Sequence, residues 1–131
     1  MKPFLDTNVL VYAVLSDDPR RPTAERLLAA GGTISVQVLN EFANVARGKL
    51  NWPWLDIEAT LALVRSRSRR VRDLGVSTHE AALLLARDHG LAFYDALIVA
   101  AALEAGCDTL FTEDMQHGRK FGSLTIINPF I

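Results

Sequence analysis

The chain has 131 residues, half of them apolar, and its 14 basic and 15 acidic side chains leave a formal net charge of −1. This length and apolar content suffice for one domain with a single hydrophobic core. The near-zero net charge excludes attraction to nucleic acid by bulk charge, so any such attraction requires a local patch.

Cysteine content and hydropathy limit the compartment. The single cysteine, Cys107, excludes an intrachain disulfide, and its apolar neighbours predict a buried thiol. No run is both long and apolar enough to span a bilayer, and the N-terminal residues contain no apolar signal segment. We therefore expect a cytoplasmic protein without a membrane partner.

Apolar periodicity predicts strands that alternate with helices along the chain. The first half is expected to contain a strand at 2–5, helices at 8–15 and from Pro22 to Gly31, a strand at 33–35, and a helix at 36–47 capped by Ser35. The second half is expected to contain a loop at 48–55, a helix at 56–70, a weak strand at 71–76, a helix capped by Thr78, an apolar helix opened by Tyr94 and Asp95, and strands at 109–112 and 123–127. The pattern predicts an α/β fold over residues 1–131, with a mostly parallel central sheet of four to five strands and helices on both faces.

Four acidic side chains are expected to meet at one end of this sheet. Asp6 and Asp114 directly follow strands, Asp95 opens a helix, and Glu41 lies in the second turn of another helix beside its apolar stripe. Ligands of parallel α/β sheets bind at the carboxyl ends of the strands. The sequence therefore predicts an acidic pocket at that end.

Each acid also has a simple structural interpretation. Asp6 and Asp95 are typical helix N-caps, and Glu113 and Asp114 are typical turn residues, with the Glu113 side chain in solvent. Glu41 is the hardest to explain in this way, because a solvated glutamate is not expected beside an apolar stripe.

Carboxylates that crowd together repel one another, and without compensation some must bind protons at neutral pH. A divalent cation removes this cost, and an all-oxygen ligand set favours Mg²⁺ or Mn²⁺. Such ions activate water and neutralise charge on a phosphodiester under attack. We therefore interpret the pocket as that of a metal-dependent nuclease.

Four segments resemble the motif blocks of PIN-domain ribonucleases: residues 5–10 (LDTNVL), 40–42 (NEF), 94–102 (YDALIVAAA) and 111–114 (FTED). More closely, the chain resembles the VapC toxins of bacterial VapBC toxin–antitoxin pairs, over essentially its whole length. The resemblance implies a Mg²⁺-dependent endoribonuclease, with Mn²⁺ as a substitute, that cleaves RNA phosphodiester bonds by metal-activated water. It also implies a VapB-like antitoxin partner and a homodimer.

The resemblance assigns roles to individual residues of the pocket. It implies that Asp6 and Asp95 bind the metal directly and that Glu41 and Asp114 bind it directly or through water. The hydroxyl of Thr112 would support the pocket. The residues that would orient Asp6 are Thr7 and Asn8.

Three other functions are alternatives to the hydrolysis of RNA. A PIN-like module that binds RNA or protein but has lost hydrolysis remains open, although the presence of all four acids favours the enzyme. A phosphatase of the haloacid dehalogenase type is disfavoured because its second aspartate would fall at Asn8. A receiver domain is disfavoured because no lysine follows the last strand.

Basic side chains between residues 65 and 72 form an acid-free run. Arg65, Arg69 and Arg72 are expected to share one helix face and to contact RNA phosphates, which predicts salt-sensitive binding. A solvated or salt-bridged surface is the alternative. Arg47 and Lys49, near the Trp52-Pro53-Trp54 loop, are further RNA-binding candidates.

Overall fold

The computed structural model describes residues 1–15 and 17–131. In this part of the chain the helices are α1 (Thr7–Val14), α2 (Arg21–Ala30), α3 (Val36–Gly48), α4 (Trp54–Arg67), α5 (Val76–His89) and α6 (Phe93–Glu104). The strands are β1 (Pro3–Leu5), β2 (Thr33–Ser35), β3 (Arg70–Arg72), β4 (Thr109–Phe111), β5 (Lys120–Phe121) and β6 (Leu124–Ile127).

The strands form one sheet in the order β3-β2-β1-β4-β6-β5. Every neighbouring pair is parallel except β5 and β6, which are antiparallel. The predicted α/β fold with a mostly parallel sheet is thus confirmed. The sixth strand, β5, escapes the prediction because its two residues are too few to show a periodic pattern.

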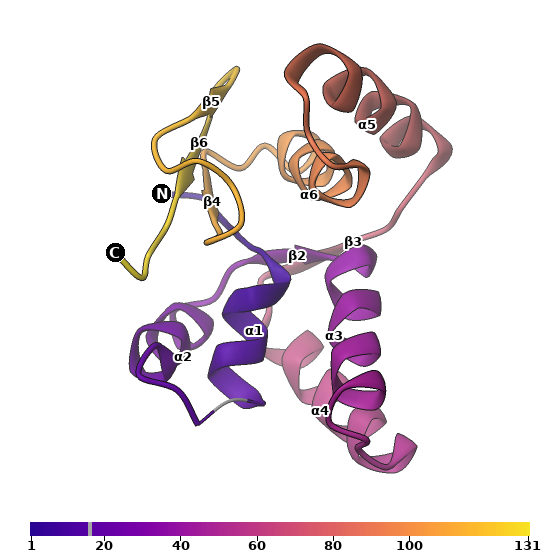
Figure 1. Cartoon of the computed structure of the whole chain (residues 1–131), viewed down its shortest axis with the longest axis vertical. Helices are drawn as coiled ribbons and strands as arrows, with labels where there is room; N and C mark the ends of the chain where they lie inside the picture. The colour runs from indigo at the N-terminus through magenta and orange to yellow at the C-terminus, as the bar shows by residue number, and fades with distance from the viewer. Residues whose placement is uncertain (16) are drawn as a thin grey trace.

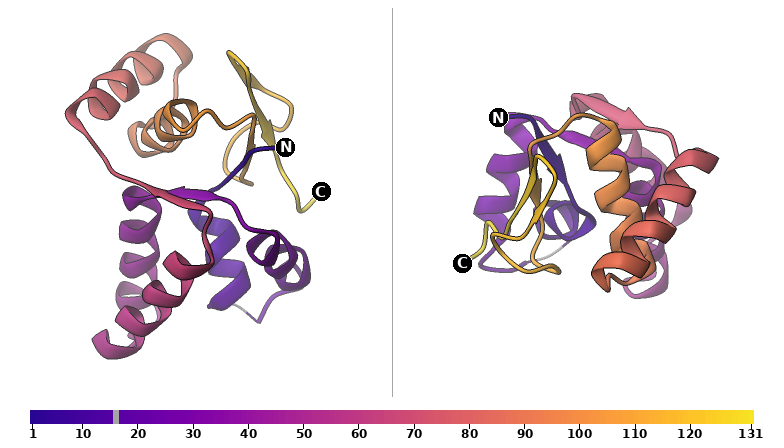
Figure 2. Two further views of the ribbon diagram at one scale, coloured as in Figure 1. Left: turned by 180° about the vertical axis from the view of Figure 1, so that it is seen from behind. Right: turned by 90° about the horizontal axis from the view of Figure 1, so that it is seen from above.

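The helices form two layers on opposite faces of the sheet. Helices α1 to α4 lie together on one side, and α5 and α6 lie on the other, as Figure 1 and both views of Figure 2 show. The chain builds the sheet outward from β1 through β2 to β3 and then returns to place β4 on the other side of β1. The strand order therefore reverses between β1 and β4, which is where α/β sheets bind their ligands.

Helix α6 is the more deeply buried of the two helices in its layer. Each residue from Ala96 to Ala102 is buried, as predicted for a central helix, and the alanines among them allow close packing against its neighbours. The thiol of Cys107 is also buried, as predicted. No helix in the described part of the chain is long and apolar enough to cross a membrane.

The predicted helix through residue 70 was wrong at its C-terminal end. Helix α4 ends at Arg67, and the Arg69 amide donates a hydrogen bond to the carbonyl of Gly32 at 2.8 Å, which leads the chain into the pairing of β3 with β2. Arg72 lies in β3. Arg65, Arg69 and Arg72 therefore do not share a helix face.

One predicted helix cap lies elsewhere, and another is in place but lacks a side-chain hydrogen bond. Thr78 lies in the first turn of α5 rather than before it, and its hydroxyl accepts a hydrogen bond from the Gly75 amide at 3.2 Å. Ser35 is the residue before α3, but its side chain forms no capping hydrogen bond.

Candidate active site

Asp6 and Thr112 lie side by side at the carboxyl ends of β1 and β4. The register pairs Leu5 with Phe111, so the next residue of each strand is also adjacent, and the Asp6 amide still donates to the Phe111 carbonyl at 3.1 Å. The Thr112 hydroxyl donates to Oδ2 of Asp6 at 2.7 Å. The strand register thus decides which hydroxyl meets the aspartate.

The Thr112 hydroxyl is a fully used hydrogen-bonding group. Besides its donated bond, it accepts hydrogen bonds from Nδ2 of Asn8 at 3.2 Å and from the Asp114 amide at 3.1 Å. A hydroxyl offers one donor and two acceptor positions, so all three are occupied in this buried side chain. Thr112 therefore holds together the residues that follow β1 and the residue Asp114 that follows β4.

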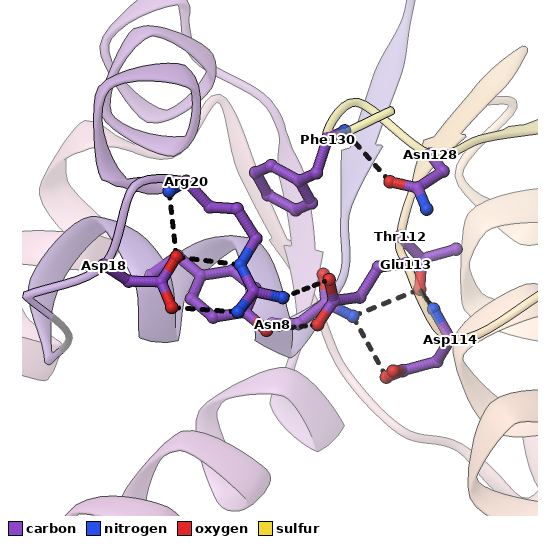
Figure 3. Close-up of polar contacts among 9 residues, drawn as sticks. Asn8, Asp18, Arg20, Thr112, Glu113, Asp114, Asn128 and Phe130 are labelled. Carbon is purple, nitrogen blue, oxygen red and sulfur yellow. Dashed lines mark hydrogen bonds and ion pairs between the residues drawn. The ribbon is translucent and has the colours of Figure 1, made fainter.

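Asp6 is also the N-cap of α1, so it caps the helix and lines the pocket at the same time. Its backbone is extended, and its Oδ1 accepts a hydrogen bond from the Thr7 amide at 2.7 Å. The next two side chains connect Asp6 to other acids: the Thr7 hydroxyl donates to Oε1 of Glu41 at 2.8 Å, and Nδ2 of Asn8 donates to Oδ2 of Asp114 at 3.0 Å. Figure 3 shows the contacts of Asn8 with Thr112 and Asp114.

All four predicted acids line one pocket of about 310 Å³. Asp95 faces it from the first turn of α6, where the preceding Ala92 is the capping position, so the interpretation of Asp95 as an N-cap was wrong. Glu41 faces the pocket from α3. Thr7 and Asn8 lie in its wall together with Tyr12 and Lys49, which come from α1 and from the end of α3.

Burial and mutual repulsion raise the pKa of three of these carboxyl groups. Burial raises the pKa of Asp6 to about 7, against the hydrogen bonds from Thr112 and Thr7 that favour its ionised form. Burial followed by the charges of Asp95 and Asp114 raises the pKa of Glu41, although a hydrogen bond from Thr7 opposes this change. Burial and the charge of Asp114 raise the pKa of Asp95. The pocket therefore holds more carboxyl groups than it can easily keep ionised.

These residues fit a hard divalent cation by their chemistry. Their donor atoms are carboxylate oxygens, and Oδ1 of Asn8 is buried without a hydrogen-bond partner among the described residues. Within the described ranges, no three acidic, histidine or cysteine side chains already form a ready metal cluster. Since Mg²⁺ keeps several of its waters, an open pocket with separated carboxylates suits it better than a closed protein cage.

The prediction that the Glu113 side chain lies in solvent was wrong. Its side chain is 22% exposed, accepts a hydrogen bond from the Tyr12 hydroxyl, and pairs with the Arg20 guanidinium at 3.1 Å (Figure 3). The Arg20 guanidinium carbon also lies 4.2 Å from the centre of the Tyr12 ring and is held by Asp18. This cluster joins the start of α2 to the segment that carries Asp114.

Tyr12 and Glu113 are site neighbours that the sequence analysis missed. Partial burial and the bond to Glu113 raise the pKa of Tyr12 to about 12, so its phenol keeps its proton at neutral pH. The available signal was helical spacing, because Tyr12 follows Asn8 by one turn and therefore projects from the same side of α1.

The candidate RNA-binding cations lie in different places. Lys49 lines the acidic pocket, whereas Arg47 donates to the Trp52 carbonyl at 3.0 Å and lies over the Trp54 ring. Arg69 lines a cavity with Pro3 and Thr33, at the amino ends of β1 and β2 and hence at the opposite end of the sheet from Asp6. The basic run does not border the acidic pocket.

Comparison with known proteins identifies the fold. The family model described as PIN domain matches residues 4–120. The structure is similar to that of Mycobacterium tuberculosis VapC20, described as a sarcin-ricin loop cleaving toxin, with a TM-score of 0.72 and 24% identity over 86% of this chain and 92% of that one. It is also similar to a chain in a toxin–antitoxin complex from Klebsiella pneumoniae, with a TM-score of 0.74 and 19% identity over 98% of both chains.

A third similar structure is that of VapBC2 from Rickettsia felis bound to a DNA fragment from its promoter. The TM-score is 0.67, and the identity is 23% over 96% of this chain and 97% of that one. No curated protein sequence matches the chain. At these identities the structural likeness establishes the fold, and it agrees with the family match.

Replacing Thr112 by valine should lower the free energy of unfolding by about 2–4 kcal/mol, because it removes the buried hydroxyl that bonds to Asp6, Asn8 and the Asp114 amide. Thr112→Ser keeps the hydroxyl and should remain within about 1 kcal/mol of the parent. Urea unfolding measures both variants. Equal stability of the valine and serine variants would show that the hydroxyl does not hold the pocket together.

The raised pKa of Asp6 predicts a pH-dependent stability in chelator. Because the folded protein binds this proton more tightly than the unfolded chain, Asp6 costs stability progressively from about pH 4 up to about pH 7. Asp6→Asn removes the titrating group, so its Tm relative to the parent should rise by about 3–8 °C between about pH 5 and pH 8.

The matched control for this comparison is Asp108→Asn. A hydrogen bond from the Lys2 amide lowers the pKa of Asp108, so its contribution is lost only in more acidic solution and its Tm difference should stay constant over the same range. A constant difference for Asp6→Asn as well would contradict the assignment of a raised pKa to Asp6.

Proposed function

The chain belongs to the PIN-domain family, and we propose that it is a divalent-cation-dependent endoribonuclease of the VapC toxin type. One observation carries this proposal: carboxylates from four separate segments of the chain line a single pocket at the point where the strand order reverses. A purely structural origin would explain one capping aspartate, but it does not explain why Glu41 and Asp95 are also brought there at the cost of raised pKa values.

The residues divide the work of the proposed site. Asp6 and Asp95 would hold the cation, Mg²⁺ or Mn²⁺, with Glu41 and Asp114 completing its surroundings directly or through water. When bound, the cation supplies charge neutralisation at the phosphodiester and activation of a water molecule. The Thr112 hydroxyl keeps Asp6 in place, and Asn8 keeps Asp114 turned toward the same pocket.

RNA is the proposed substrate because the pocket chemistry suits a phosphodiester and because the similar VapC20 is described as a toxin that cleaves the sarcin-ricin loop. The low identity leaves the RNA target of this chain to experiment. A PIN-like module that binds without cleaving is the second candidate. The presence and convergence of all four acids weigh against it.

We further propose a VapB-like antitoxin as inhibitor and a homodimer as the assembled state. The similar Klebsiella pneumoniae structure is a toxin–antitoxin complex, and the similar Rickettsia felis structure is that of VapBC2. Exposed apolar side chains on this chain support protein partners: Leu55 and Leu63 protrude from α4, and Leu83 and Leu84 protrude from α5. Such surfaces are typical of protein interfaces.

Asp6→Asn should abolish Mg²⁺-dependent RNA cleavage, by at least about 100-fold, while the fold stays intact, because the amide keeps the volume but removes a charged ligand. The assay sequences the fragments that protein purified free of antitoxin leaves on total RNA, with Mg²⁺ and with chelator. Circular dichroism confirms folding.

Asp108→Asn is the control, because it removes a carboxylate at the opposite end of the sheet, next to Lys2, and should cleave as the parent does. Equal cleavage by Asp6→Asn and the parent would refute the proposed site. Parent protein that binds RNA but leaves it intact in both Mg²⁺ and Mn²⁺ would favour the binding module instead.

A further inference from the structure

A second hollow, of about 560 Å³, opens beside the acidic pocket. It shares Glu41, Val45 and Lys49 with that pocket, so the two hollows adjoin. We call its separate part the amide groove, which is lined by Gln37, Asn40, Asn44 and Tyr94. The amide groove therefore lies next to the carboxylates that would receive the scissile phosphate.

The amides of the groove come from one stripe of α3. Residues 37, 40 and 44 recur at intervals of three and four, which aligns them along the helix with Glu41. The apolar stripe of the same helix, Val38, Phe42 and Ala46, is completely buried in the core. Packing thus fixes α3 and turns its polar stripe toward the groove.

The three amide side chains differ in their burial and in their hydrogen bonds. Gln37 is 8% exposed, and its hydrogen bond to Glu41 favours the ionised form of that carboxyl group. Asn40 and Asn44 are exposed, and their side chains form no hydrogen bond to the described residues. A side-chain amide carries both donors and an acceptor, which match the edges of nucleobases.

Tyr94 adds a flat surface to the groove. Tyr94 is 62% exposed and directly precedes Asp95 in the first turn of α6. The centres of the Tyr94 and Phe93 rings are 6.0 Å apart. Exposed aromatic rings bind single-stranded nucleic acids by stacking on their bases. Lys49 is exposed and forms no ion pair within the described residues, so its ammonium group is available to a phosphate.

We propose that the amide groove binds an unpaired nucleotide next to the scissile phosphate of RNA. The base stacks on Tyr94, Asn40 and Asn44 hydrogen-bond its edge, and Lys49 contacts the adjoining phosphate. This rests on the proposed function and adds to it a base-binding subsite, made by α3 and the start of α6, beside the phosphate site. A base within a duplex is already stacked on both faces and cannot meet Tyr94.

The test measures RNA binding in the Asp6→Asn background, in which the RNA should stay intact. Fluorescence anisotropy follows a labelled single-stranded oligoribonucleotide and the same sequence as a duplex. Tyr94→Ala should raise the Kd for the single strand by roughly 5- to 100-fold, the range expected for loss of one stacked base, with little effect on the duplex. Tyr94→Phe keeps the ring and should retain binding.

Trp54→Ala is the matched control, because Trp54 is an exposed aromatic residue, at 58%, that lines neither hollow. It should bind the single strand as the background protein does. The proposal is overturned if Tyr94→Ala binds the single strand normally, if Trp54→Ala loses as much affinity, if duplex binding falls equally, or if the background protein does not bind the single strand. Normal single-strand binding by Tyr94→Ala would favour a protein partner, instead of a base, as the ligand of the groove.

Cleavage by the parent sequence separates this inference from the proposed function. Cleavage that persists alongside Tyr94-independent binding refutes the groove and keeps the nuclease. Single-strand binding that depends on Tyr94, in a protein whose parent never cleaves RNA, keeps the groove and refutes the nuclease.

Discussion

Crowding of negative charge at the carboxyl edge of the sheet is the constraint on which the rest of the site depends. Asp6, Glu41, Asp95 and Asp114 come from different elements, and the fold gathers them at the reversal of strand order between β1 and β4. Burial and mutual repulsion oppose their ionisation. A divalent cation would relieve this repulsion, so the carboxylates that cost the cation-free protein stability are also those on which the proposed phosphodiester chemistry rests.

Backbone pairing turns this crowding into a defined geometry. The register of β1 with β4 places Thr112 beside Asp6, and the buried hydroxyl then reaches Asn8 and the Asp114 amide as well. A side chain that uses its donor and both its acceptors has one favourable orientation. On the far side of the same segment, the pairing of Glu113 with Arg20 and Tyr12 holds the backbone that carries Asp114.

The sequence predicted the acids because their positions follow from local patterns. Short apolar runs end directly before Asp6 and shortly before Asp114. Glu41 is a charged residue beside the apolar stripe of its helix, where a solvated side chain is not expected. The predictions failed where contacts between residues far apart in the sequence determine the local structure. Arg69 bonds to Gly32 and leaves the helical pattern, and Glu113 finds partners about a hundred residues away, at Tyr12. The polar stripe of α3 was visible in the spacing, but its place beside the pocket depends on how α3 and α6 meet.

The most direct test of the account is a titration with Mn²⁺ followed by electron paramagnetic resonance. If the four carboxylates share one cation site, the parent protein should bind Mn²⁺, and Glu41→Gln and Asp95→Asn, which alter different helices, should each weaken that binding by about tenfold or more. Asp108→Asn should bind as the parent does. Binding that is unchanged in both Glu41→Gln and Asp95→Asn would show that these side chains do not act on a common ion, and would contradict the central claim.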